Sequence, residues 1–75
     1  MSQKLPVLKS KEVIRALEKL GYRQHRQTGS HLIMVKDGSS IQPIVPIHNR
    51  DLKKGTLRAI IRETGCTVEE FCSYL

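Results

Sequence analysis

The chain has few aromatic residues and few cysteines. Its 75 residues include three aromatic side chains and no tryptophan. So few rings leave no surplus for base stacking, which argues against readout of single-stranded RNA on an aromatic platform, and we expect Tyr22 and Phe71 in the core. The two cysteines, Cys66 and Cys72, form neither a CxxC pair nor part of a histidine-rich cluster. We therefore expect reduced packing residues, and neither a metal site nor a cofactor.

Long apolar runs are also missing. No apolar stretch approaches the roughly 20 residues that a membrane span requires, and the first residues lack the apolar segment of a signal peptide. We therefore expect a cytoplasmic protein that has no membrane partner.

Positive charge is in excess and unevenly distributed. The 13 Lys and Arg residues outnumber the 7 Asp and Glu residues, for a formal net charge of +6. Every basic residue lies at or before Arg62, whereas the segment from Glu63 to Leu75 holds three glutamates and no base. A basic body of this kind indicates a polyanionic partner, most commonly nucleic acid. The alternative is a basic surface that only keeps the protein soluble.

The length limits the chain to one small domain, about one layer of helix on one layer of sheet. We treat residues 1–8, which have no clear period, as a loose leader, and residues 9–75 as the domain. A first helix is predicted from Ser10, as its N-cap, to Gly21, as its stop. Its apolar stripe at helical spacing consists of Val13, Ile14, Leu17 and Leu20.

Three strands are predicted next. The segment Tyr22–Arg26 is a weak candidate because its alternation is mostly polar. The segment His31–Lys36 is stronger, since it has apolar residues at both odd and even positions, as in a central strand. A tight turn at Asp37-Gly38 then predicts that Ile41–Ile47 returns antiparallel to it. The two prolines of this last strand place it at an edge of the sheet.

Two further helices complete the expected fold. A second stripe at helical spacing consists of Leu57, Ile60 and Ile61, and Thr67 and Glu70 have the spacing of a capping box that starts a short last helix. The whole predicts an α+β fold, the αβββα arrangement of double-stranded-RNA-binding domains (dsRBDs). In it, two helices cover one face of a three-stranded antiparallel sheet, and a short C-terminal helix follows.

The run Gly29-Ser30-His31 stands at the start of the most β-prone segment. A glycine and a small hydroxyl residue let backbone and substrate approach closely, and an imidazole both takes and gives protons near neutral pH. This combination indicates RNA cleavage without a metal, because that reaction moves protons to and from ribose oxygens. From the residues alone, the alternative is a histidine that is only hydrogen-bonded at a strand start.

The start of the second predicted helix is basic. Lys53, Lys54 and Thr56 stand where the free N–H groups of a helix N-terminus attract phosphate, although an ordinary solvated first turn explains the same spacing. Together with cations near the histidine, this start gives the expected RNA-binding set. Its members are Arg26, Gly29, Ser30, Lys36, Lys53, Lys54, Thr56 and Arg58.

Several short motifs, in a fixed order, carry a resemblance to a known family. They are Gly21-Tyr22, Arg26-Gln27-Thr28-Gly29-Ser30-His31, Val45-Pro46-Ile47-His48, Leu52-Lys53-Lys54-Gly55-Thr56-Leu57-Arg58-Ala59-Ile60-Ile61 and Glu69-Glu70-Phe71. Over about residues 9–71 the chain resembles the HicA (YcfA-like) toxins of type II toxin–antitoxin pairs. The resemblance implies a dsRBD-like fold and a ribosome-independent mRNA interferase, an endoribonuclease whose catalytic histidine is here His31. It also implies a HicB-type antitoxin that binds the toxin and blocks this site.

A second proton carrier is needed, because one histidine cannot at once deprotonate the attacking 2′-hydroxyl and protonate the leaving 5′-oxygen. His48 is the preferred candidate, followed by His25 and then water. Two other interpretations stay open: a non-catalytic dsRBD-like module that binds RNA, and an interaction protein whose basic surface serves an acidic partner. Replacing His31 with alanine separates them, since the nuclease alone depends on this imidazole.

Overall fold

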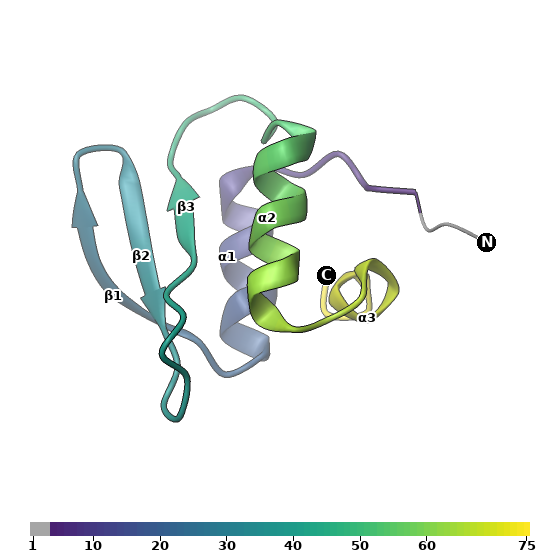
Figure 1. The fold of residues 1–75 in the computed structure, drawn as a ribbon. Helices are drawn as coiled ribbons and strands as arrows, with labels where there is room; N and C mark the ends of the chain where they lie inside the picture. The colour runs from purple at the N-terminus through teal and green to yellow at the C-terminus, as the bar shows by residue number, and fades with distance from the viewer. Residues whose placement is uncertain (1–3) are drawn as a thin grey trace.

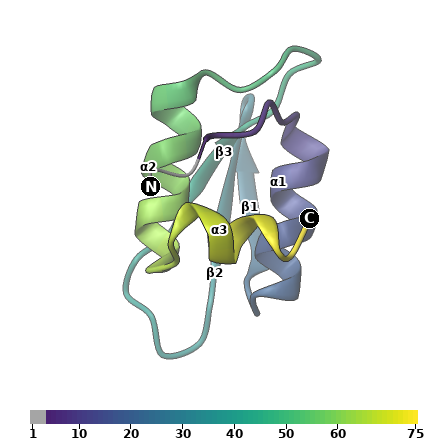
Figure 2. The ribbon, with the colours of Figure 1, turned by 90° about the vertical axis from the view of Figure 1, so that its right-hand side faces the viewer.

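The computed structural model describes residues 4–75. Its elements are α1 (Ser10–Lys19), β1 (Arg23–Thr28), β2 (His31–Val35), β3 (Ile44–Pro46), α2 (Lys54–Thr64) and α3 (Val68–Cys72). The strands form one antiparallel sheet in the order β1-β2-β3. Helices α1 and α2 cover one face of the sheet, and α3 lies on the side of these helices away from it (Figures 1 and 2). The predicted α+β class with an αβββα arrangement is confirmed.

The core lies between the sheet and the two long helices. It contains Val13 and Leu17 of the predicted α1 stripe and the whole α2 stripe, together with Leu32, Met34 and Val45 from the sheet. Ile14 and Leu20 of the α1 stripe are partly buried against this core. Tyr22 and Phe71 are buried, as expected, and burial raises the pKa of the Tyr22 phenol above its ordinary value. The capping box of α3 is present: Thr67 N donates to Glu70 Oε1 (2.8 Å), and Glu70 N donates to Thr67 Oγ1 (3.0 Å).

Helix α1 begins one residue earlier than predicted. Lys9, with extended backbone, is the N-cap, and its N–H donates to Glu12 Oε1 at 2.9 Å. Ser10 is the first helical residue, and its buried hydroxyl donates to the carbonyl oxygen of Pro46 at 2.5 Å. The prediction of Ser10 as N-cap is therefore wrong, because a tertiary hydrogen bond to the end of β3 takes the hydroxyl that a cap would use.

Part of the expected leader is packed against the domain. Leu8 belongs to the core, and its carbonyl oxygen accepts from Leu52 N at 2.8 Å. Leu5 is partly buried against the same core. The segment is therefore held by the fold at these two residues and is not loose there. Residues 1–3 of the expected leader lie outside the described residues.

The edges of the sheet differ from each other. All six residues of β1 are exposed, and a β-bulge interrupts its pairing with β2 between Gln24 and Arg26. Strand β3 lies at the opposite edge, as its prolines predict, but it is shorter than the expected Ile41–Ile47. After the turn at Asp37-Gly38 the chain runs as a loop and joins β2 through the bond from Met34 N to Pro43 O (2.9 Å). Proline, which has no N–H to donate, ends the ladder there.

Candidate active site

One end of the sheet gathers segments that are far apart in sequence. The β1–β2 turn, the end of β3 and the first residues of α1 and α2 meet there, at the top of Figure 1. Two hydrogen bonds fasten them: Ile47 N donates to Ser30 O (2.6 Å), and the Ser10 hydroxyl donates to Pro46 O (2.5 Å). We call this region the site end. It contains the Gly29–Ser30 turn and the strand residue that follows it, so the predicted catalytic motif lies at its centre.

The turn before His31 is a two-residue hairpin turn. Thr28 pairs with His31 across it, and Gly29, its first residue, has a φ of +59°. A positive φ at the first central position is typical of a type II′ turn, which favours glycine there. A Cβ added at Gly29 would meet no atom within 4 Å. The glycine is therefore required by backbone conformation and leaves open space in front of the turn.

His31 is the first residue of β2 and is exposed. Its neighbour Leu32 is buried against the helices, so alternation along the strand directs His31 to the open face of the sheet. Arg26 pairs with Ile33, two residues further along β2, and therefore shares that face with His31. The structure thus brings the predicted catalytic imidazole and one predicted RNA-binding cation to the same side of the sheet.

His48 lies in the loop that follows β3. Its Nδ1 accepts a hydrogen bond from Arg50 N at 3.2 Å, and its backbone N and O each lie 3.5 Å from Ser10 Oγ. These contacts show that His48 helps to shape the loop before α2. In its neutral form the proton is on Nε2, because Nδ1 is the acceptor. A role as second proton carrier stays a prediction.

His25 lies at the β-bulge in the middle of β1. It lies three positions before Thr28, which is about 10 Å at the rise of an extended strand. The third histidine is therefore separated from the hairpin turn, and the structure gives no support for His25 as the partner of His31.

The basic start of α2 reaches the site end. Lys53 is the N-cap and Lys54 is the first helical residue, both exposed, and Thr56 and Arg58 follow within the first two turns. Sequence analysis missed Lys9, whose Nζ donates to Asn49 O at 3.2 Å in the same region. No local pattern marks Lys9, because only the packing of α1 against the end of β3 brings it there.

Lys36, in contrast, lies at the far end of the sheet. It follows β2, and its ammonium lies over the ring of Tyr22, 5.5 Å from the ring centre. It lies five positions after His31 along an extended strand, a distance of about 17 Å. The structure therefore does not bring Lys36 together with the other predicted RNA-binding residues.

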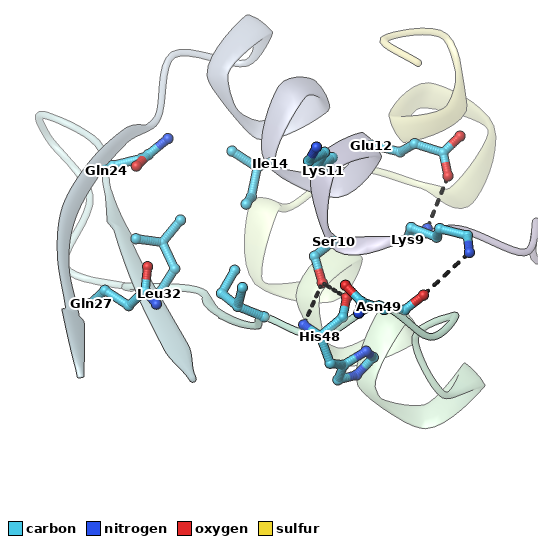
Figure 3. A pocket seen from close by; sticks show the side chains of 11 residues that line it. Lys9, Ser10, Lys11, Glu12, Ile14, Gln24, Gln27, Leu32, His48 and Asn49 are labelled. Carbon is cyan, nitrogen blue, oxygen red and sulfur yellow. Dashed lines mark hydrogen bonds between the residues drawn. The ribbon is translucent and has the colours of Figure 1, made fainter. Parts of the chain in front are cut away.

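A cleft of about 1070 Å³ opens beside the site end, between α1 and β1. Figure 3 shows its two walls: Gln24 and Gln27 extend from the sheet, and the first turns of α1 face them. Ile14, Leu32 and Ile47 supply its aliphatic surface. The ring of His48 lies at the rim and is directed away from the glutamines (Figure 3). Gln27 belongs to a motif that carries the family resemblance, but the sequence assigns no role to either glutamine.

The αβββα fold and a basic sheet end that carries a histidine define a small dsRBD-like domain. A family model described as HicA toxin of bacterial toxin-antitoxin matches residues 10–66, about three quarters of the chain. The protein therefore belongs to the HicA toxin family, whose membership implies an antitoxin partner. No curated protein matches the chain. Within residues 4–75, no helix combines the length and the apolar character needed to cross a membrane.

Proposed function

We propose that this toxin is an endoribonuclease, a cytoplasmic mRNA interferase whose catalytic residue is His31. The observation that carries the proposal is the position of this side chain. It is exposed on the last rung of the sheet, directly after a glycine turn, at the end where α2 begins with Lys53 and Lys54. An open strand end beside the free N–H groups of a helix start suits an RNA phosphate.

The proposed chemistry is general acid–base catalysis by the imidazole. Neutral His31 takes the proton of a ribose 2′-hydroxyl as that oxygen attacks the adjacent phosphorus, or its protonated form gives a proton to the departing 5′-oxygen. The fragments then end in a 2′,3′-cyclic phosphate or a 3′-phosphate and in a 5′-hydroxyl. Arg26, on the His31 face, meets the negative charge that grows on the phosphorane. His48 is the proposed second carrier and acts through Nε2, since Arg50 N occupies Nδ1.

The proposed antitoxin is a HicB-type protein that covers His31. An exposed imidazole on an open sheet face can be covered by a protein surface without any change of the fold. The positive charge of the toxin, +6 in total, suits an acidic contact surface on that partner.

The test is induced expression in bacteria of the wild type, His31→Ala and His25→Ala, with folding confirmed by circular dichroism. His25 is a matched control, because it is an exposed histidine on the same sheet that lies away from the turn. We expect growth arrest and loss of mRNA with the wild type and His25→Ala, and neither with His31→Ala. Equal arrest by His31→Ala would reject the assignment, and RNA binding without cleavage by all three would favour the non-catalytic module. Fragments with 5′-phosphate ends would reject the chemistry.

A further inference from the structure

The cleft between α1 and β1 takes part in the function proposed above only through His48, which lies at its rim. Gln24 and Gln27 line it from β1, where they pair with Met34 and Leu32. Both partners are buried under the helices, Met34 with no exposed surface and Leu32 with 4 %. Both glutamines are nevertheless exposed, because the cleft separates this part of β1 from α1. Their amide groups therefore line an open surface that a ligand can reach.

The chemistry of the cleft is divided between its walls. Ile14, Leu32 and Ile47 form an aliphatic surface. On the sheet side, Gln27 gives one N–H to Gly29 O at 3.0 Å, which leaves its amide oxygen and its second N–H for a ligand. Gln24 gives one N–H to Glu18 Oε2 at 3.4 Å, so each amide keeps its oxygen and one N–H side by side for a ligand.

The helix side of the cleft is positively charged. Lys9 and Lys11 line it, together with Glu12, whose carboxylate already accepts from Lys9 N. The two lysines outnumber the one glutamate, which favours a ligand that carries an anionic group.

We propose that the cleft binds one nucleobase of the RNA strand, close to the phosphate that is cut. A base has two apolar faces for the aliphatic surface and a polar edge for the glutamine amides, and the lysines meet its phosphate. The volume, about 1070 Å³, is at the upper end of ordinary ligand pockets and accepts a base with its sugar. This inference rests on the proposed function, because it makes the cleft a subsite of the same nuclease.

The cleft and His31 are close enough for neighbouring nucleotides. Gln27 pairs with Leu32, and the next rung of the ladder is Thr28 with His31. The two rungs are about 3.3 Å apart along the strand, and their side chains lie on opposite faces of the sheet. The turn between the faces contains only glycine and serine, so an RNA strand passes over it with little obstruction. One end of a dinucleotide then lies in the cleft and its phosphate lies at His31.

The experiment uses the full chain with His31→Ala, so that bound RNA is not cut. Fluorescence anisotropy measures the affinity for a short labelled RNA and for copies of it with one base removed at each successive position. The same series is repeated after Gln24→Met with Gln27→Met, which removes both amides but keeps side-chain length. Gln42→Met is the matched control, because Gln42 is exposed in the loop at the far end of the sheet.

We expect removal of the base at one position to weaken binding by roughly 5- to 100-fold, as good amide contacts to a base edge do. This penalty persists with Gln42→Met and disappears in the double variant. Equal penalties in all three proteins, or no penalty at any position, overturn the inference. The side-chain amide NMR signals of Gln24 and Gln27 identify the occupant directly. If they shift with the antitoxin but not with RNA, the cleft serves the protein partner and the inference is also overturned.

The two proposals fail in different ways. If the wild type cuts RNA through His31 and no penalty depends on the glutamines, the nuclease stands and the base site is rejected. If the glutamine-dependent penalty is found but the wild type cuts no RNA, the base site is supported and the nuclease is rejected.

Discussion

Replacing Ser10 with alanine removes a buried hydroxyl that joins the start of α1 to the end of β3. Ser10 is 4 % exposed, and its Oγ is 2.5 Å from Pro46 O. The variant leaves this carbonyl oxygen without its donor in a half-buried place, which costs about 1–2 kcal/mol. Alanine returns at most about 0.5 kcal/mol through its higher helix propensity. The net loss is about 1 kcal/mol, a measurable part of the roughly 4–11 kcal/mol expected for a domain of this size.

Urea unfolding measures this loss. With a denaturant dependence of about 1 kcal/mol per molar, the midpoint of Ser10→Ala falls by about 1 M. Ser40→Ala, at an exposed serine of the loop before β3, is the control and keeps the midpoint of the wild type. A Ser10→Ala midpoint that equals that of the control would refute the argument, because the hydroxyl would then contribute nothing beyond what water supplies. The proposed nuclease activity implies a lower cleavage rate in the folded variant as well, since the same hydroxyl lies 3.5 Å from His48 N.

Three further predictions concern the turn, the core and the helix start. Gly29→Ala destabilises the protein by about 1–2 kcal/mol through its positive φ alone, and an unchanged urea midpoint would contradict this. The raised pKa of Tyr22 means that the folded chain holds the phenol proton more tightly than the unfolded chain. The contribution of this proton to the free energy of unfolding is therefore complete below about pH 10, the ordinary pKa of tyrosine. It is lost as the pH rises through the higher pKa of Tyr22 in the folded chain. Tyr22→Phe therefore loses less stability than the wild type between neutral and strongly alkaline pH, and parallel unfolding curves would reject the link. Lys54→Ala lowers the slope of log affinity for RNA against log salt by about 1, while Lys36→Ala, at the far end of the sheet, leaves it unchanged.

The helices could be predicted because their signals are local. The stripe of Leu57, Ile60 and Ile61 is buried on α2 as its spacing indicates, and the box of Thr67 and Glu70 starts α3. Each signal depends on residues three or four apart, which contact one another in any helix. The central strand could also be predicted, because a short run that is apolar at both odd and even positions is typical of a strand covered on both sides.

The site could be predicted only in part, because its other members depend on tertiary packing. Strand β1 is polar throughout, and pairing with β2 makes it longer than the predicted Tyr22–Arg26. Lys36 is only five positions from His31 in sequence, but the extended strand between them places the two residues about 17 Å apart. The place of Gln24 and Gln27 beside the cleft could not be predicted, since it depends on the register between two strands and on the position of α1.

The β-bulge in β1 determines which of its side chains lie on the same face of the sheet. Gln24 and Gln27 are three residues apart, and a regular strand would direct them to opposite faces. Their partners Met34 and Leu32 are two residues apart and share one face, because the bulge at His25 takes up the additional residue. His25 is the additional residue and has no partner in the ladder, so many side chains fit at position 25. Deletion of His25 would leave a regular ladder, in which Gln24 and Gln27 still share the cleft face and Arg26 keeps the open face.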